Sequence, residues 1–379
     1  MSPSVALSTP GGPSRTPSPT PTLTPTPTRT PTPVARWTKP KQVSAAKHCS
    51  SLTAGIDAAS RYHIAAECNG SIRYFTSEAA GRWKATVFAH PANREDLDPQ
   101  IAFWGDVVYV GYSRIAPSDG CGSTRGRDLG VYFRSRSQPN GAWSVPRRIG
   151  EPGDHLQSLR VDGATIHATV TSAEDGLAYY ETLTGRTYKR YPLPKVFGPT
   201  SLRIGNDGRA RIAYSTAGGV GFAVFNGSGF SRARIPGSAE DDQAPSLVLD
   251  GGDKAHVLWT RRPPAGGCVT REPNPDDGTY YATNASGKWK TQRIAKDTSD
   301  ATLQVDAETG RPHVLISRRS GLWYFTTASA GKWTGIRASS KSWPSSPLLR
   351  LDPATGTLLA VYIDSPFTTS SRIYALTKP

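Results

Sequence analysis

The sequence predicts an all-β fold, a seven-bladed β-propeller made of four-stranded antiparallel blades. An aromatic mark recurs at a mean interval of about 49 residues, the range of such blades. Between the marks, short runs of alternating polarity are separated by Gly-rich turns, and the two ends of the chain hold complementary parts of one unit. The mark, usually preceded by Gly and one further residue, falls at Trp37, Trp83, Trp143, Tyr188, Phe230, Trp289 and Trp333.

Residues 1–33 are expected to be a disordered Pro/Thr-rich stalk ahead of a propeller at 34–379. They hold ten Pro, nine Thr and five Ser and no aromatic residue. Such a segment buries too little apolar surface to offset its ordering entropy, and its prolines favour extended polyproline II. It is either a plain tail or, as the composition favours, a spacer from a cell surface. The first residues lack the basic and apolar regions of a signal peptide, so we expect the export signal or anchor outside this sequence.

Each unit repeats one pattern, which residues 244–262 (APSLVLDGGDKAHVLWTRR) illustrate. A short alternating run ends at Asp250, turns through two glycines and resumes as a second strand from His256. A third run, TYYATNA, and a fourth, WKTQRIA, follow after further turns. This period of two between turn residues predicts antiparallel strands, and no segment shows a sustained helical period.

The chain ends predict how the ring closes. The seventh unit runs from Pro347 to the C-terminus and stops after three strands. Residues 35–43 (ARWTKPKQV) match the missing fourth strand. We therefore expect the N-terminal strand to complete the last blade, which leaves no open sheet edge between the first and last units.

Composition excludes several classes of protein and partner. Gly 37 and Pro 32 among 379 residues lack the collagen period, and no apolar run approaches the 18 to 20 residues that span a bilayer. The formal net charge of +15 raises the question of nucleic acid. However, many basic residues flank the fourth-strand aromatics, where they form an outer rim that blunts edge pairing and makes no groove. We expect no nucleic-acid partner, no membrane insertion by this chain, and a monomer.

The four cysteines fit an oxidising compartment. Cys49 begins one strand and Cys68 ends the next, so a hairpin turning at residues 58 and 59 places them opposite each other. Cys121 and Cys268 lie in long insertions after the second strands of units two and five, nearly opposite in a ring of seven, where a bridge over the channel mouth is reasonable. The alternative is four unpaired thiols in a reducing cytoplasm.

Histidines recur at the start of the second strand in four units. Equivalent positions in a ring are spread around it and do not converge on one ion, so a repeated structural hydrogen bond is favoured over a metal site. Aspartates likewise recur at the first turn, where they are expected to be turn formers. We assign no metal and no cofactor. The residues are His63, His167, His256 and His313, and Asp57, Asp162, Asp250, Asp306 and Asp352.

A candidate ligand site is expected on the face that bears the long insertions. Five residues beyond the histidine position the units diverge, into Cys68, Arg114, Ser172, Thr216, Arg261, Arg318 and Asp364. Folding alone demands no such variety, and three arginines suit a carboxylate or sulfate; the alternative is three solvated or locally paired arginines. Two residues earlier, Tyr112, Trp259 and Tyr362 are expected to offer aromatic surface to a sugar, with Asp98, Asp242 and Asp364 as hydrogen-bond acceptors.

Three turns, TSEAAGRW, TNASGKW and TASAGKW, resemble the Asp-box turn Ser-x-Asp-x-Gly-x-Thr-Trp of sialidases and related bacterial propellers, with the Asp and Thr absent. In sialidases three arginines hold the sialic acid carboxylate, a Tyr paired with Glu is the nucleophile and an Asp is the acid/base. The resemblance implies such a role for Arg114, Arg261 and Arg318, although the order and spacing differ and sialidases have six blades. Seven-bladed bacterial lectins are the closer analogy.

These observations predict an extracellular or cell-surface module that binds a glycan or another polymer, possibly acidic, on the loop face. The alternatives are a sialidase-like glycoside hydrolase and a protein-binding scaffold without activity. Hydrolysis needs a nucleophile or paired carboxylates on that face, whereas a lectin needs aromatic platforms and hydrogen-bonding groups.

Overall fold

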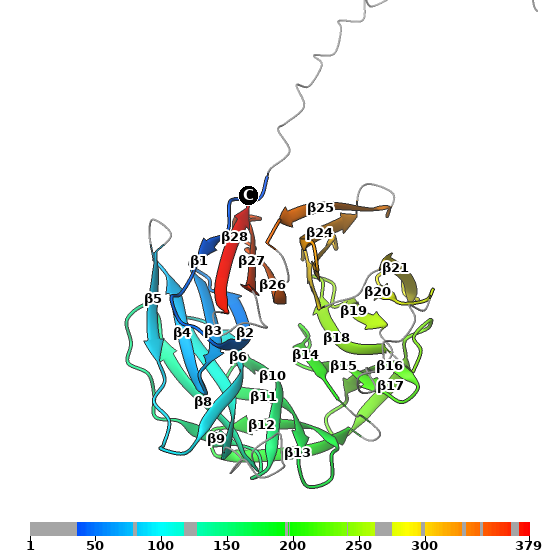
Figure 1. The fold of residues 1–379 in the computed structure, drawn as a ribbon. Helices are drawn as coiled ribbons and strands as arrows, with labels where there is room; N and C mark the ends of the chain where they lie inside the picture. Colours follow the sequence, from blue (N-terminus) through cyan, green and yellow to red (C-terminus); the bar gives the residue numbers. More distant parts are fainter. Residues whose placement is uncertain are drawn as a thin grey trace, which may run out of the picture. The chain divides into compact units, whose positions relative to one another are not determined.

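The computed structural model describes residues 36–78, 82–116, 127–193, 196, 198–240, 242–261, 275–296, 300–327, 331–341, 344–364 and 371–379, and the compact unit runs from Arg36 to Pro379. Within these residues 28 strands form seven four-stranded antiparallel sheets, and no helix is present (Figure 1). The predicted seven-bladed β-propeller is confirmed. The predicted stalk at residues 1–33 lies outside the described residues, so it stays a prediction.

Every blade has the same order of strands, from the innermost to the outermost. The first strands are β2 (Cys49–Ile56), β6 (Glu95–Trp104), β10 (Asp154–Asp162), β14 (Thr200–Ile204), β18 (Asp242–Leu249), β22 (Ala301–Val305) and β26 (Ser345–Leu351). The second strands are β3 (Tyr62–Cys68), β7 (Val107–Ala116), β11 (Thr165–Ser172), β15 (Ala210–Thr216), β19 (Ala255–Arg261), β23 (Pro312–Arg318) and β27 (Leu358–Asp364). The third strands are β4 (Ser71–Ser77), β8 (Arg127–Ser137), β12 (Ala178–Thr184), β16 (Gly219–Phe225), β20 (Gly278–Thr283), β24 (Gly321–Thr327) and β28 (Arg372–Lys378). The fourth strands are β5 (Trp83–Val87), β9 (Arg147–Ile149), β13 (Thr187–Leu193), β17 (Phe230–Arg234), β21 (Lys290–Ala295), β25 (Trp333–Ser339) and β1 (Lys41–Gln42).

The first strands form the wall of a central channel. Each contacts the first strand of the next blade, and β26 of blade seven contacts β2 of blade one, so the ring is closed. The last blade has the order β1, β28, β27, β26, in which the N-terminal strand is the outermost (Figure 1). The predicted completion of this blade by residues 35–43 is confirmed.

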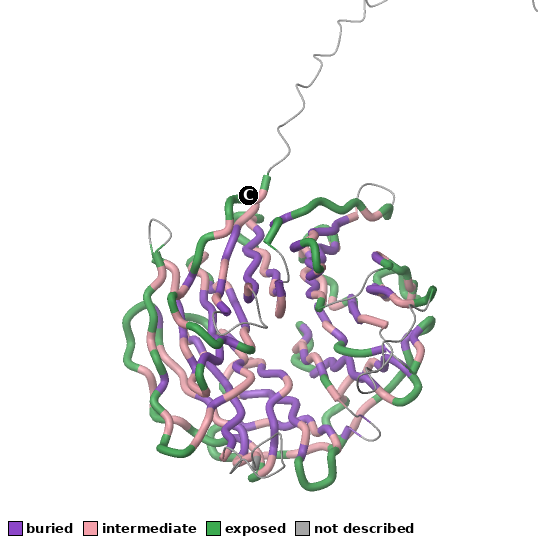
Figure 2. The backbone as a smooth tube through the Cα atoms, viewed as in Figure 1, coloured by how far each residue is buried: buried purple, intermediate pink, exposed green. Residues whose placement is uncertain are grey.

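The hydrophobic core is divided into seven layers, one between each pair of adjacent blades. Second strands are buried along almost their whole length, as in β23, because both of their faces pack against other blades. Fourth strands such as β21 are mostly exposed. Figure 2 shows this gradient from a buried interior to an exposed rim.

The propeller has two faces. We call the face with the turns between first and second strands the turn face, and the opposite face, with the connections between second and third strands, the loop face. On the turn face, Asp57 Oδ1 accepts hydrogen bonds from the backbone N–H groups of Ala59 and Arg61, both at 2.9 Å. Asp250, Asp306 and Asp352 make equivalent bonds, which confirms these aspartates as turn formers.

The four repeated histidines form one repeated structural bond, as predicted. In each blade the ring Nδ1 faces a third-strand tyrosine hydroxyl, in the pairs His63–Tyr74, His167–Tyr180, His256–Tyr281 and His313–Tyr324. In blade one, Nε2 also lies 2.9 Å from Asp57 Oδ2, so Nε2 carries the proton and Nδ1 accepts from the tyrosine. Burial lowers the pKa of His63 and of His313 to about 4, which keeps both rings neutral.

Cys49 and Cys68 form a disulfide across the first two strands of blade one, with their Cα atoms 4.1 Å apart. This confirms the first predicted bridge. Cys121 and Cys268 lie outside the described residues. Both insertions that carry them join second to third strands, since β7 ends at Ala116 and β19 at Arg261.

Candidate functional site

Two of the predicted arginines are held in buried clasps on the loop face. Arg114 is only 6 % exposed, and its Nε and Nη2 donate to the two carboxylate oxygens of Asp96 at 2.6 and 2.9 Å. Arg261 donates to Asp242 in the same way, at 2.7 and 3.1 Å, and also to the Gly237 carbonyl. In both blades the carboxylate lies at or next to the start of the first strand, and the arginine lies at or near the end of the second. The local pairing considered as the alternative therefore describes these two residues.

The other predicted polar residues differ in exposure: Arg318 and Asp364 are partly exposed to solvent, whereas Asp242 is buried. Arg318 lies over the rings of Trp323 and Phe325, 5.0 and 5.3 Å from their centroids. Asp364 Oδ2 is 3.8 Å from Lys341 Nζ. Asp242 is 1 % exposed and is engaged by Arg261, so it is not an acceptor for a ligand. The three arginines belong to the second strands of blades two, five and six.

The three predicted aromatic platforms are core residues. Tyr112 and Tyr362 are 0 % exposed and Trp259 is 1 % exposed, which leaves no ring face for a sugar. Their second-strand positions are enclosed by the neighbouring blades, and this enclosure is the physical reason for the correction. Each packs beside the third-strand ring directly across the sheet, in the pairs Tyr112–Tyr132, Trp259–Tyr280 and Tyr362–Tyr374.

Those third-strand rings were missed by the sequence reasoning. In five blades an aromatic residue at this position is half-buried near the loop face and has a cation over its ring. Their recurrence could have been found in the sequence, because all five aromatic residues lie opposite the same second-strand position in the strand register. The pairs and cation-to-centroid distances are Arg114–Tyr132 (4.5 Å), Arg190–Tyr179 (3.7 Å), Arg261–Tyr280 (4.3 Å), Arg318–Trp323 (5.0 Å) and Lys341–Tyr374 (5.5 Å).

A histidine between two carboxylates also lies on the loop face. His155, at the start of β10, places Nε2 2.9 Å from Asp98 Oδ2 and Nδ1 3.3 Å from Asp128 Oδ1. The Asp98 side chain is 45 % exposed, whereas those of His155 and Asp128 are 11 % and 9 % exposed. Asp98 was predicted as an acceptor, but its two partners were not found, because blades two and three bring them together from three separate strands.

This arrangement suits an imidazole that donates from both nitrogens, because both face carboxylate oxygens. Asp98 occupies the left-handed region with φ 49°, at a β-bulge in the first strand. Ala244 and Ser346 have φ 51° and 48° at the bulges of blades five and seven, so the backbone shape belongs to the repeat. The exposed carboxylate belongs to blade two.

A tyrosine paired with a glutamate, the kind of pair that sialidases use, occurs in blade three. Tyr188 Oη donates to Glu181 Oε1 at 2.7 Å, and Arg190 lies 3.5 Å from the same oxygen and 3.0 Å from Asp154 Oδ2. Burial, and then the charge of Asp154, raise the pKa of Glu181 to about 8. Glu181 is 0 % exposed, so this pair belongs to a buried network and not to an open site.

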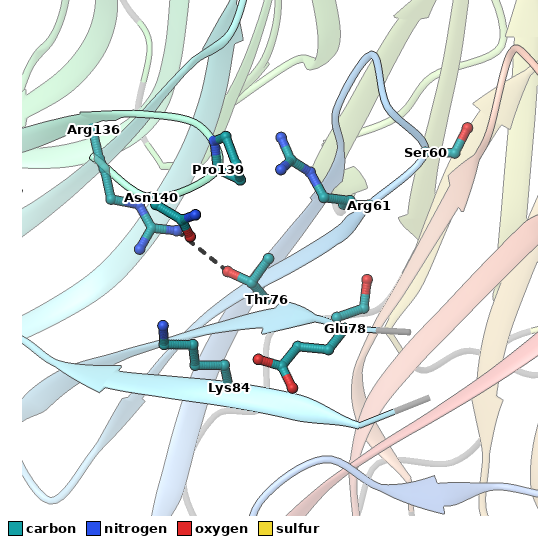
Figure 3. Close-up of a pocket in the computed structure, with 9 residues that line it drawn as sticks. Ser60, Arg61, Thr76, Glu78, Lys84, Arg136, Pro139 and Asn140 are labelled. Atoms are coloured by element: carbon teal, nitrogen blue, oxygen red, sulfur yellow. Dashed lines mark hydrogen bonds between the residues drawn. The ribbon is translucent and has the colours of Figure 1, made fainter. Parts of the chain in front are cut away.

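The turn face has a polar pocket of about 400 Å³ between blades one and two (Figure 3). Its two arginines are engaged locally: Arg61 Nε donates to Asp57, and Arg136 lies over the rings of Tyr74 and Trp143. The lining residues are Ser60, Arg61, Thr76, Ser77, Glu78, Lys84, Arg136, Pro139 and Asn140. Within the described residues no group of His, Cys, Asp and Glu is arranged to hold a metal ion. No helix among those residues is long and apolar enough to cross a membrane.

No protein-family model matches the chain, and no curated protein matches it. Solved structures share its fold. A Dyadobacter fermentans protein of unknown function has a TM-score of 0.57 at 12% identity, over 92% of this chain and 99% of that one. The polysaccharide lyase Uly1 has a TM-score of 0.52 at 11% identity, over 88% and 90%.

A sialidase from Trypanosoma rangeli in complex with sialic acid has a TM-score of 0.51 at 8% identity. The match covers 91% of this chain and 57% of the sialidase, so the chain spans little more than half of that enzyme. At these identities the similarity establishes the propeller fold. The propellers that share it include a sialidase and a polysaccharide lyase.

Proposed function

We propose that this protein is an extracytoplasmic module that binds a glycan through the loop face of its propeller. The observation that carries the proposal is the repeated cation over a half-buried third-strand ring in five blades. An aromatic edge supplies apolar contact to a sugar ring, and a guanidinium supplies charge-assisted bonds to hydroxyls or to an acidic substituent. The Cys49–Cys68 disulfide supports an exported location.

Blade six offers a pair of cation and ring outside the clasps that Arg114 and Arg261 form with Asp96 and Asp242. Arg114 and Arg261 hold the ends of first strands through Asp96 and Asp242, so their loss would perturb the fold. Arg318 instead lies over Trp323, whose Nε1 donates to Ser320 Oγ at 3.3 Å in the connection to the third strand. This residue pair is therefore the place to test binding.

The experiment is a glycan array probed with the full chain, followed by titration of the best glycan. Arg318→Ala and Trp323→Ala should each weaken binding about ten- to a hundredfold, the effect of losing 1.5 to 3 kcal/mol of charged or aromatic contact. Lys288→Ala on the exposed rim is the control and should bind like the wild type. Equal weakening by the rim change, or no glycan bound at all, would overturn the proposal.

A second candidate function rests on the His155 constellation. An imidazole within hydrogen-bond distance of two carboxylates is equipped to move a proton, so the loop face also supports cleavage of a glycosidic bond by general acid/base chemistry. A fluorogenic glycoside panel separates the two functions. Turnover by the wild type that is lost in His155→Gln and kept in Lys288→Ala would establish an enzyme; binding without turnover would establish a lectin-like module.

A further inference from the structure

Three arginines meet in the central channel, at a position that the sequence reasoning passed over. Arg160, Arg203 and Arg350 are carried by the first strands of blades three, four and seven. Each lies in the strand register opposite the second-strand position that carries histidine in four blades. Blade six has Gln304 at this position and blade one has Gly55, so channel lining alone requires no arginine.

The three side chains line one cavity of about 290 Å³ with Gln304. The other described residues around it are apolar or glycine, and no carboxylate is among them. First strands of several blades bound this cavity, so the three positive charges share one space in the channel. Their neighbours in the wall are Ala54, Gly55, Ile56, Ile101, Ala102, Phe103, Val161 and Leu351.

The guanidinium groups have only neutral acceptors among the described residues. Arg160 Nη1 donates to the Leu159 carbonyl at 2.5 Å, and Arg203 Nη1 donates to the Leu202 carbonyl at 2.8 Å. Arg350 donates to the carbonyls of Leu349 and Ala54 at 2.7 and 2.6 Å. Each guanidinium carries five N–H donors, so most of them are left for the cavity.

The electrostatics of the cluster are unfavourable without a counterion. Burial and the charge of Arg350 lower the pKa of Arg160 to about 9, and burial lowers the pKa of Arg350 to about 10. Both side chains remain charged at neutral pH. The contrast with Arg114, Arg190, Arg211 and Arg261 is clear, because each of those has a carboxylate partner. Arg160, Arg203 and Arg350 are half-buried. A partly buried cation without a paired charge is costly, and here three share one cavity.

We infer that the channel is a binding site for a doubly charged oxyanion, sulfate or phosphate, held by Arg160, Arg203 and Arg350. The planar donor forks of arginine match the oxygens of such an anion, and Gln304 adds a neutral amide to the same cavity. The anion is either inorganic or a substituent of a larger molecule. The site is separate from the loop-face rings and does not depend on the proposed glycan-binding function.

The test is calorimetric titration of the full chain with sodium sulfate and sodium phosphate at low ionic strength, with sodium chloride as reference. The wild type should bind the divalent anions, and Arg160→Gln, Arg203→Gln and Arg350→Gln should each bind at least tenfold more weakly. Lys288→Gln, which removes one positive charge from the rim, should bind like the wild type. Absence of binding by the wild type, or equal binding by the channel variants, would overturn the inference.

Thermal melting separates an anion site from a structural role. In anion-free buffer Arg160→Gln should melt at or above the wild-type temperature, because it relieves repulsion, and millimolar sulfate should raise the wild-type Tm but not that of the variant. A variant that melts lower by the same amount with and without sulfate would show a structural role instead. Glucose 6-phosphate and glucose 6-sulfate, with glucose as control, distinguish a substituent from a free anion: equal or tighter binding of the esters identifies a substituent, and binding of the inorganic ions alone identifies a free anion.

Discussion

Lys41, near the start of the described chain, lies directly opposite Ala375, four residues from its end, in the outermost strand pair of blade seven. The Thr38 N–H donates to the Thr377 carbonyl at 2.8 Å and the Val43 N–H to the Ile373 carbonyl at 2.9 Å, so the pairing extends on both sides. Trp37 adds an edge contact to Tyr324 of blade six, with ring centroids 5.5 Å apart. The N-terminal strand thus joins the last two blades.

Deleting residues 1–33 should leave the Tm almost unchanged. Deleting 1–44 should lower it by roughly 5 to 10 °C, because loss of the outermost strand and of the half-buried Trp37 should together cost about 3–5 kcal/mol. Differential scanning calorimetry of the two truncations measures the effect. Similar melting of both would mean that the closing strand contributes little to the ring.

Peptide mapping of non-reduced protein should recover Cys49 joined to Cys68, because both are buried and bridged across two strands. Cys49→Ser together with Cys68→Ser should lower the free energy of unfolding by about 2–4 kcal/mol. Cys121 joined to Cys268 is predicted in the same digest. Four alkylatable thiols in protein recovered from its own compartment would contradict both bridges.

The buried histidines should make the protein less stable in acid. His63 and His313 titrate near pH 4 in the folded state and near 6.5 when unfolded, so their contribution is complete above pH 6.5 and is lost as pH falls to about 4. Protonation of each histidine should lower the free energy of unfolding by on the order of 3 kcal/mol over this pH range. Urea unfolding between pH 7.5 and 4.5 should show a shallower pH dependence for His313→Gln than for the wild type, with Lys288→Gln as control. Parallel curves would be the contrary result.

Glu181 should act in the opposite sense. Its folded pKa of about 8 exceeds the unfolded value, so its favourable contribution is complete below about pH 4.5 and is lost as pH rises through 8. Glu181→Gln keeps an oxygen for the Tyr188 hydroxyl and removes the ionisation. The variant should therefore gain stability over the wild type by roughly 1 kcal/mol per pH unit across this range. A stability difference that is constant from pH 5 to 8.5 would argue against a protonated Glu181.

The Arg114–Asp96 clasp should be important for stability. Arg114→Met leaves a buried carboxylate without its partner and should cost about 3–5 kcal/mol, whereas adding Asp96→Asn should recover much of the loss. A double-mutant cycle by urea unfolding measures the coupling. Arg82→Met, in a 4.0 Å pair with Glu78 on exposed side chains, is the matched control and should have little effect.

The repeat could be predicted from the sequence because its signals are local. Asp250 followed by two glycines and His256 defines a turn and the strand after it, and each such unit needs only its own residues and the next blade to form. The same locality predicted the Cys49–Cys68 bridge, since hairpin register follows from counting outward from the turn. Closure of the ring by residues 35–43 could be predicted because the sequence shows three strands in the seventh unit and one additional strand before the first.

Tertiary structure decided which side chains are available for binding. Tyr112 and Tyr132 are both tyrosines near the loop face, yet the first is enclosed between blades and the second is half-buried, a difference set by packing on both sides of the sheet. Arg114 and Arg160 are likewise indistinguishable as residue types. The first lies across from Asp96 and the second faces the channel, because the ring places the first strands around an axis that no single repeat contains. The local sequence pattern therefore determined the blades. The packing of the blades around the channel determined which charged side chains are available to a ligand.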